Sequence, residues 1–336
     1  MKLIELHILQ SFPVSCLNRD DLNSPKTAIF GGVNRARVSS QSWKRAIRLK
    51  AREMLPECFG GVRTKNIKGE IEKSLESQGI DINDKKIQKR VEEVNKELSK
   101  DTLIFLSRNE INMLADLVKD GEQEIKSAIK TALKNGVSDS ADIALFGRMV
   151  ATNTNFNVEA ASMFSHAIST SKISNDIDFF TAVDDCQSDD DIGASHMGTL
   201  EFNSATYYRY TALNVDQLKD NLKSSGVENI KDIVNVFIRA CLLAVPQARK
   251  TSMNADTLPS CVIGVVKENG QPVQLVNAFE NPVKRSDGGS IAENSAKAMK
   301  KHLDDINRIW GFKNECEVSI PEKTLSEFIE EVMKHV

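Results

Sequence analysis

The sequence predicts an α+β fold in which a β-sheet domain is interrupted by a long helical insertion. The composition is typical of a globular protein, with 40% hydrophobic and 27% charged residues over 336 positions, and it excludes disordered and membrane-spanning classes. Outside residues 61–172 the expected elements run strand, helix, strand, strand, helix, strand. Inside that range the apolar residues recur mainly at helical spacing.

Residues 1–60 are expected to contain the first strand and the first helix. Residues 3–9 are rich in apolar β-formers, and the polar residues between Pro13 and Pro25 indicate a long loop. The pair Gly31 and Gly32 then separates this loop from residues 33–38. The serines among residues 39–42 supply candidate N-caps for a helix over residues 43–55.

The insertion begins after Gly60-Gly61. Its apolar residues follow a helical period in three stretches, which are Ile87, Val91, Val94 and Leu98, then Ile111, Leu114 and Val118, then Ile125, Ile129 and Leu133. A further helix is predicted near residues 159–170. We expect these amphipathic helices to pack against one another rather than to bind a membrane or a cofactor.

The rest of the chain alternates between strands and helices. Strands are expected at residues 178–183 and 199–210, helices at 213–222, 230–245, 291–309 and 322–335, and a hairpin at 261–279 around the turn signal Glu268-Asn269-Gly270. Without the insertion, the order of elements is the split βαβ plan of ferredoxin-like and RNA-recognition folds.

Charge is distributed unevenly along the chain. The 44 basic and 47 acidic residues give a net charge of −3. Residues 22–52 nevertheless carry a charge of +8 with no acid among them, from Lys26, Arg35, Arg37, Lys44, Arg45, Arg48, Lys50 and Arg52. The other 305 residues carry −11. The basic segment therefore favours a partner that bears phosphates.

The predicted helix in this segment has a basic face. At about 100° per residue, one face collects Gln41, Lys44, Arg45, Arg48 and Arg52. Trp43, Ile47 and Met54 share a different face and are expected to pack inward. Ser39 and Ser40 add hydroxyl and amide groups at the helix N-terminus, where the helix dipole favours an anion. Such a face suits several phosphates of a nucleic-acid backbone.

The aromatic residues do not suggest that bases are read. RNA-recognition domains that read bases place aromatic side chains on their central strands, and no such run occurs here. Tyr207, Tyr208 and Tyr210 are the nearest approach, and we expect them to pack in the sheet. Any RNA is therefore expected to be held by its backbone.

Several other classes of site are not indicated. The six cysteines are scattered without a Cys-x-x-Cys pair, so we expect reduced thiols and neither a zinc site nor a disulfide framework. The first apolar stretch is too short and polar for a signal peptide, and no run approaches the ~20 residues of a membrane helix, so a cytoplasmic location is expected. No cofactor motif is present, and no cofactor is expected.

Nuclease activity and DNA binding remain open as alternative functions at this point. Seven aspartates between Asp176 and Asp191 could bind Mg²⁺ for nuclease chemistry, although a solvated acidic loop is the commoner explanation. His166 and His196 could serve as general base and acid in RNA cleavage. A DNA-binding helix-turn-helix built on the Trp43 helix is the other alternative, and it would bind one duplex sequence without RNA.

Collinear blocks over nearly the whole chain carry a further signal. They are SCLNRDD (15–21), AIFGG (28–32), RVSSQSWKRA (37–46), DIALFGRM (142–149), SHAI (165–168), DIDFFTAVDD (176–185), HMGT (196–199), YRY (208–210) and NAFE (277–280). Together they resemble the CasC family, which forms the backbone of the type I-E CRISPR surveillance complex, Cascade.

The resemblance implies a hand-shaped protein with a modified RNA-recognition palm, a helical fingers insertion and a β-hairpin thumb. Residues 1–60 would begin the palm, residues 61–172 would form the fingers, and residues 173–191 would return to the palm. Residues 192–206 would form the thumb, and residues 207–336 the second part of the palm with the C-terminal helices.

The resemblance also implies roles for individual residues. Guide-RNA phosphates would be held by Arg19, Lys26, Ser39, Gln41, Lys44, Arg45 and Arg48. Met163 would wedge against a base, and His196, Met197 and Thr199 would lie on or beside the thumb. The fingers, around residues 63–66, would face the target DNA strand.

The implied function is structural rather than enzymatic. Copies of the chain would polymerise head to tail along CRISPR guide RNA, beside other Cascade subunits, and present the guide for pairing with target DNA. No catalytic residue and no metal site are expected. The main alternative is a CRISPR endoribonuclease of the RNA-recognition-like superfamily.

Overall fold

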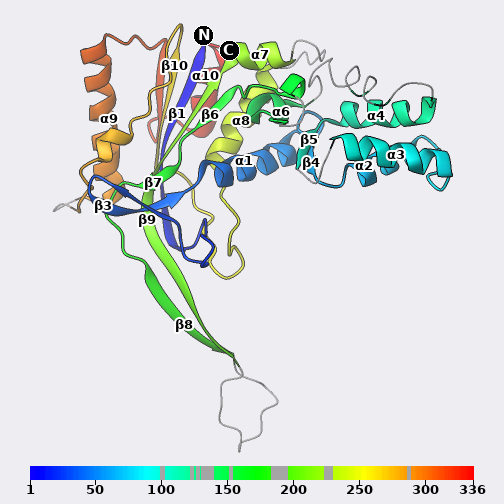
Figure 1. The fold of residues 1–336 in the computed structure, drawn as a ribbon. Helices are drawn as coiled ribbons and strands as arrows, with labels where there is room; N and C mark the ends of the chain where they lie inside the picture. The colour runs from blue at the N-terminus through cyan, green and yellow to red at the C-terminus, as the bar shows by residue number, and fades with distance from the viewer. Residues whose placement is uncertain are drawn as a thin grey trace, which may run out of the picture. The chain divides into compact units, whose positions relative to one another are not determined.

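The computed structural model describes residues 1–98, 103–121, 125, 129, 140–150, 154–182, 196–222, 230–285 and 289–336 (Figure 1). These residues form two units. Unit 1 comprises Met1–Lys2, Arg48–Met163 and Leu213–Ile238, and unit 2 comprises Leu3–Ile47, Phe164–Ala212 and Arg239–Val336. Strand β6 (Ser162–Phe164) lies at the boundary between them.

Unit 2 is built on one β-sheet whose strands differ in length. Its strands follow the order β11–β10–β1–β9–β7–β3–β2, with bounds β11 (Cys316–Ile320), β10 (Cys261–Lys267), β1 (Leu3–Ser15), β9 (His196–Asn214), β7 (Ala167–Ser169), β3 (Val33–Val38) and β2 (Thr27–Phe30). The chain passes through α1 (Ser40–Met54) between β1 and β7, and through α8 (Ile230–Leu243) between β9 and β10. The central order β10–β1–β9–β7 is that of the split βαβ plan, so the predicted α+β fold is confirmed.

A two-stranded ribbon and three helical segments complete unit 2. Strand β8 (Asp176–Ala182) is exposed at every residue and pairs with β9 from Asp176↔Phe202 to Ala182↔His196. This β8–β9 hairpin projects from the rest of the sheet (Figure 1). The segment η2 (Val276–Phe279), helix α9 (Ile291–Trp310) and helix α10 (Leu325–Met333) follow toward the C-terminus.

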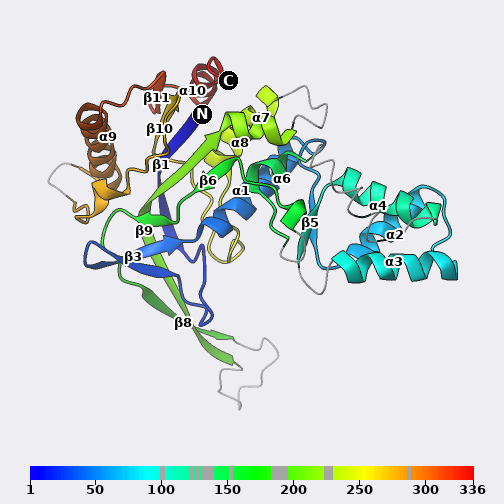
Figure 2. The same cartoon turned by 45° about the horizontal axis from the view of Figure 1, so that its top comes forward.

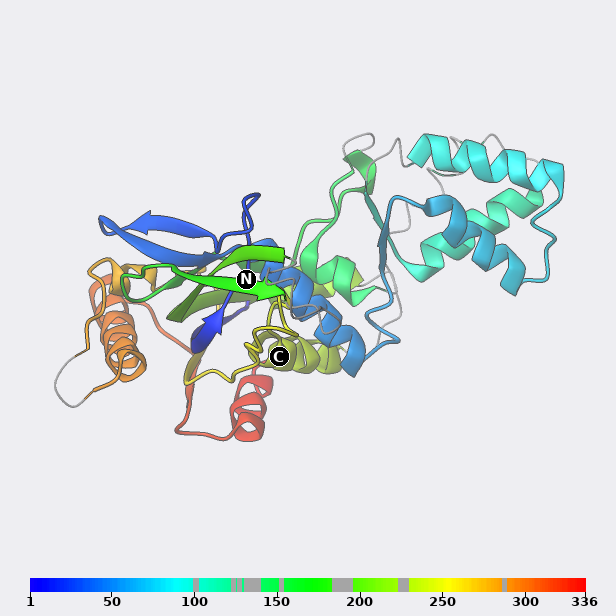
Figure 3. The same ribbon diagram turned by 90° about the horizontal axis from the view of Figure 1, so that it is seen from below.

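Unit 1 contains the predicted helical insertion. Helices α2 (Ile67–Ser77), α3 (Lys85–Leu98) and α4 (Arg108–Asp120) lie side by side (Figures 2 and 3) and share one apolar core. Strands β4 (Val62–Thr64) and β5 (Ile104–Leu106) pair beside them. Helices α6 (Ala141–Phe146) and α7 (Val215–Leu222), with η1 (Thr154–Phe156), complete the unit. The helical periods at 87–98 and 111–118 are confirmed, and Leu133 lies outside the described residues.

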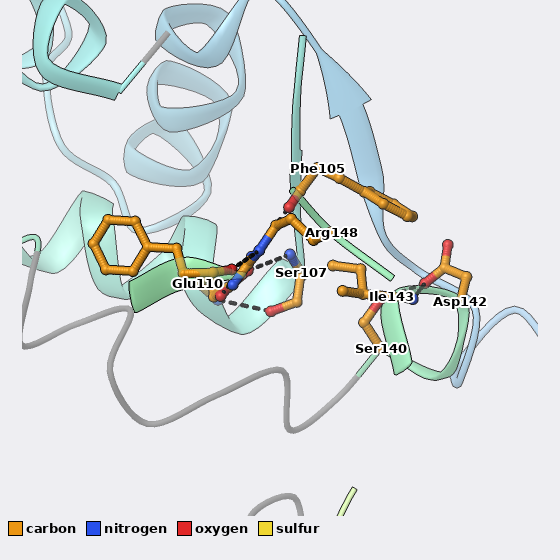
Figure 4. A network of polar contacts seen from close by, with 8 residues as sticks. Phe105, Ser107, Glu110, Ser140, Asp142, Ile143 and Arg148 are labelled. Atoms are coloured by element: carbon orange, nitrogen blue, oxygen red, sulfur yellow. Dashed lines mark hydrogen bonds and ion pairs between the residues drawn. The ribbon is translucent and has the colours of Figure 1, made fainter. Parts of the chain in front are cut away.

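A buried ion pair fixes the start of α4 in unit 1. Arg148 Nη1 donates to Glu110 Oε1 and Oε2 at 2.8 and 2.7 Å (Figure 4). Glu110 also closes a capping box with Ser107, and Arg148 donates to the carbonyls of Phe105 and Phe156. The short motif Phe146-Gly147-Arg148 thus has a structural role, because its arginine neutralises a buried carboxylate.

Two sequence predictions about secondary structure are wrong. Residues 159–170 form β6 and β7 rather than a helix, because β7 inserts between β3 and β9, with Arg37↔Ile168 on one side and Ile168↔Tyr208 on the other. The predicted 261–279 hairpin is absent from the described structure, since β10 pairs with β1 and β11. The amides of Val273 and Leu275 instead donate to the side chains of Glu5 and Tyr208.

A single arginine holds the β2–β3 ribbon in unit 2. Arg35 is fully buried and donates to five carbonyl oxygens, those of Phe30, Ser169, Thr170, Phe279 and Glu280, at 2.7 to 3.2 Å. The turn of the ribbon passes close to the same segment. Gly31 has φ +58°, and a Cβ there would lie 1.7 Å from the Glu280 carbonyl oxygen. Only glycine fits this approach.

We expect Arg35→Lys to lower the free energy of unfolding by at least about 2 kcal/mol, because an ammonium lacks the planar fork of donors and leaves buried carbonyls unpaired. Chemical denaturation followed by circular dichroism measures the loss. The same substitution at Arg308, which is 72% exposed beside Asp305, is the matched control and should stay within about 0.5 kcal/mol. Equal losses for the two variants would contradict this role of Arg35.

Candidate nucleic-acid interface

Two of the predicted basic residues of unit 2 line a cavity beside the first half of α1. The cavity has a volume of about 500 Å³, and Arg19 and Arg45 both line it with exposed side chains. The remaining lining residues are Leu17, Asn18, Asp20, Asn23, Ser42, Ala46, Pro246, Gln247 and Ala248. The lining thus contains two guanidinium groups and a single carboxylate, so its net charge is positive. The amides of Asn18, Asn23 and Gln247 add neutral polar groups.

The loop before β2 is held in shape by its own polar side chains. Asp20 Oδ1 accepts from the amides of Leu22 and Ser24 at 2.9 and 3.0 Å, and Arg19 Nη1 donates to Asn23 Oδ1 at 3.0 Å. Asn18 Oδ1 accepts from the amide of Ser39 at 2.9 Å, which ties the loop to the residue just before α1. The predicted long loop is therefore an ordered wall of the cavity.

One wall of the cavity was missed by the sequence reasoning. Pro246, Gln247 and Ala248 follow α8 and line the cavity together with Arg19. Next to them, Arg249 adopts φ +53°, and its guanidinium acts electrostatically on the buried thiol of Cys16. Burial raises the pKa of that thiol, while Arg249 and Arg19 oppose the rise. The basic pair Arg249-Lys250, a few residues after the helix predicted at 230–245, was the available sequence signal.

The basic face of α1 is divided between the two units. Gln41 and Arg45 are exposed as predicted, and Trp43 and Ile47 are buried. Lys44 is half-buried, with Nζ 5.5 Å from the centre of the Phe164 ring, and burial lowers its pKa. These residues belong to unit 2. Gln41, Lys44 and Arg45 can reach an anion from one face of the helix.

Arg48 and Arg52 do not point outward as predicted. In unit 1, Arg48 Nη1 and Arg52 Nη2 lie 3.8 and 3.6 Å from Oδ2 of Asp142, whose side chain is fully buried. Asp142 Oδ1 also accepts from the Ile143 amide and the Ser140 hydroxyl (Figure 4). Arg48 stacks 5.0 Å above the Phe105 ring, so most of its guanidinium is used within unit 1.

The other predicted contact residues are scattered over different environments. Lys26 and Met163 are half-buried, and Met197 and Thr199 are exposed on the β8–β9 hairpin. Ser39 is only 1% exposed, and its hydroxyl has no hydrogen-bond partner within the described part of the chain. The backbone of His196 pairs with Ala182, and its side chain lies outside what the structure describes.

A second buried arginine supports α1 from the sheet side in unit 2. The Arg209 guanidinium lies 3.6 Å from the centre of the Trp43 ring and donates to Gln10 Oε1 and, at 2.6 Å, to the Cys241 carbonyl oxygen. Burial lowers its pKa to about 9, so it remains charged at neutral pH. This cation–π contact anchors the inward face of the helix whose outward residues line the cavity.

The tyrosines pack as predicted. Tyr207, Tyr208 and Tyr210 are buried. The Tyr208 hydroxyl forms a hydrogen bond with His7, and the Tyr210 hydroxyl donates to Glu5. Burial lowers the pKa of His7 to about 3. Buried rings present no stacking platform, so these residues cannot read bases from the surface.

Most of the aspartates proposed for the alternative metal site lie outside the described residues. Asp176 and Asp178 are exposed on β8, whereas Asp184, Asp185 and Asp189 to Asp191 lie outside the described residues. Within the described ranges no group of three His, Cys, Asp or Glu side chains could hold a metal ion. The five cysteines in those ranges are free, and none of the helices described is long and apolar enough to cross a membrane.

The fold and the cavity together define an α+β protein of the split βαβ plan with a basic face on its first helix. The chain belongs to the CT1975-like protein family, whose profile matches residues 4–333. No curated protein matches the sequence.

Two solved structures show the same fold. A chain of a structure described as a CRISPR RNA-guided surveillance complex, pre-nicking, is 27% identical with a TM-score of 0.82, and the match covers 99% of each chain. A chain of a second CRISPR RNA-guided surveillance complex is 24% identical with a TM-score of 0.65, covering 99% of this chain and 98% of that one. The shared fold thus extends over both units.

We expect Arg48→Ala to lower the free energy of unfolding by about 1 to 3 kcal/mol, because the buried carboxylate of Asp142 loses a cationic partner. Arg45→Ala removes an exposed side chain and should change stability by less than about 0.5 kcal/mol. Urea denaturation compares the two variants. If Arg45→Ala were as destabilising as Arg48→Ala, the division of the basic face would be wrong.

Proposed function

We propose that this chain is a guide-RNA-binding backbone subunit of a CRISPR surveillance complex, of the CasC kind found in the type I-E Cascade. The observation that carries the proposal is the match over 99% of both chains, at a TM-score of 0.82, with a chain of a CRISPR RNA-guided surveillance complex. A match of this extent includes the sheet, the insertion and the hairpin together, so it concerns the whole architecture rather than a common sheet alone.

The chemistry of unit 2 supports binding to an RNA backbone. Arg19 and Arg45 offer cationic donors around one cavity, and Lys44 adds a third cation from the neighbouring position on α1. Phosphates are favoured over neutral groups at such donors. The tyrosines that might have stacked on bases are buried in the sheet. A subunit with these properties binds guides of any sequence, as a complex that carries different spacers requires.

The β8–β9 hairpin supports a role in assembly along the guide. Ile177, Phe179 and Met197 are 61 to 68% exposed on a ribbon that projects from the sheet. Apolar side chains presented in this way fit contacts with RNA bases or a further copy of the chain. Head-to-tail repetition of one such contact forms an open filament along the guide. In the proposed complex the fingers, including the exposed Arg63 and Lys65, face the target DNA strand.

We propose that the chain itself does not cleave RNA. Purified protein incubated with its guide RNA, with and without Mg²⁺, should leave the RNA intact over hours on a denaturing gel. Cleavage that disappears in His166→Ala or His196→Ala would favour the alternative endoribonuclease and overturn this proposal. Sequencing of RNA that co-purifies with the chain should recover CRISPR guides of many different spacer sequences.

Arg19→Ala, Lys44→Ala and Arg45→Ala should each weaken RNA binding to a similar degree for three unrelated single-stranded sequences. Each lost phosphate contact should reduce the slope of log K against log salt by about 0.7 to 1, because fewer counterions are released. Fluorescence anisotropy at several salt concentrations measures both quantities, with Arg308→Ala as the control. An unchanged slope in the triple variant would show that these residues face solvent alone.

A further inference from the structure

Three basic residues outside the α1 cavity lie on neighbouring segments of the unit 2 sheet, just before β2, on β3 and just before β7. Strand pairing brings them together: the Arg37 amide donates to the Lys26 carbonyl oxygen at 2.8 Å, and Arg37 pairs with Ile168, two residues after His166. The Arg37 side chain is oriented by Nε, which donates to the Thr27 carbonyl oxygen at 3.0 Å. The Ser165 amide donates to the Tyr210 carbonyl oxygen, which fixes the turn that presents His166.

The contact between Arg37 and His166 defines the state of the imidazole. Arg37 Nη1 lies 3.2 Å from His166 Nδ1. A guanidinium group only donates, so Nδ1 accepts, and the ring is neutral with its hydrogen on Nε2. Burial, Arg37 and Lys26 all lower the pKa of His166. The charged groups that act on the ring from β3 and from the residue before β2 are therefore both cations.

Such an arrangement is favourable for an anion. An oriented guanidinium, a lysine and an exposed imidazole offer donors from three neighbouring chain segments. No carboxylate among the described residues forms an ion pair with Arg37 or Lys26. A phosphate held by Lys26 and Arg37 would replace the cationic field at His166 with a negative one, and the imidazolium form would then be favoured.

We propose that Lys26, Arg37 and His166 form a second phosphate subsite for the RNA backbone, and that His166 takes up one proton from solvent when the phosphate binds. The proton enters at Nδ1. Arg37 Nη1 must then release the ring and turn to the phosphate, since two N–H donors cannot face each other. The inference rests on the proposed function and extends it to Arg37 and His166, which the cavity at α1 does not include.

The linkage has a definite sign. The RNA-bound state holds more protons than the free state, so affinity rises as pH falls from 8 to 6, and the gain levels off below the pKa of free His166. A rise of one unit in that pKa on binding corresponds to about a tenfold gain in affinity once both states are protonated.

The test follows the titration of His166 by NMR of its ring Cε1 proton, in the free protein, with sulfate and with single-stranded RNA. His166→Gln assigns the signal, and it should also abolish the dependence of RNA affinity on pH. His302→Gln, on α9, is the control and should retain that dependence. We expect the titration midpoint of His166 to rise by about one pH unit with sulfate and with RNA.

The outcomes separate this inference from the proposed function. An unchanged midpoint with both sulfate and RNA, while Arg45→Ala still weakens RNA binding, would overturn the second subsite alone. A midpoint that rises with sulfate in a protein that binds no RNA would support the anion subsite and contradict the proposed function. Equal pH dependence of RNA binding in wild type and His166→Gln would also overturn the role of His166.

Discussion

The hydrogen bonds of one buried guanidinium group determine the arrangement of the basic side of unit 2. Arg35 joins the β2–β3 ribbon to the end of β7 and to the end of η2. Its guanidinium donates to the carbonyl oxygens of Phe30, Ser169 and Phe279 in these three parts of the chain. Because β3 leads directly into α1, the position of this ribbon sets where the helix begins. It also places Lys26 and Arg37 beside the turn that carries His166. A lysine at position 35 could not reach all five acceptors at once.

Local sequence patterns correctly predicted the elements that are stabilised by residues close to them in the sequence. Helical periods located α3, α4 and α9, and a run without acids located the basic segment. The patterns failed where distant partners decide the structure. Residues 273–279 alternate between apolar and polar side chains as a strand does. Their amides at 273 and 275 nevertheless donate hydrogen bonds to the side chains of Glu5 and Tyr208 instead of to a neighbouring strand. Residues 162–169 pair within the sheet because edges of β3 and β9 are available to them, which no local spacing reveals.

In the candidate site, the position of a residue on its helix was predictable from the sequence, but its contacts with distant segments were not. The angular position of Arg48 on α1 was correct, but its environment depends on Asp142, which is 94 positions away in the sequence and fully buried. The wall formed by Pro246 to Ala248 comes from a segment still farther along the sequence. The whole-chain charge of −3 concealed the basic segment, whereas its local charge of +8 predicted a ligand that bears phosphates. Side-chain roles implied by the family resemblance remain predictions.

Arg35 and Arg209 share a property that separates them from the surface cations. Both are charged and at least 96% buried, and both are solvated by carbonyl, amide or aromatic groups instead of carboxylates. Mobile counterions cannot approach a sealed charge as closely as an exposed one. These two arginines therefore contribute positive charge to unit 2 from its interior. Concentrated salt weakens the attraction of the exposed side chains for an anion far more than it weakens this internal contribution.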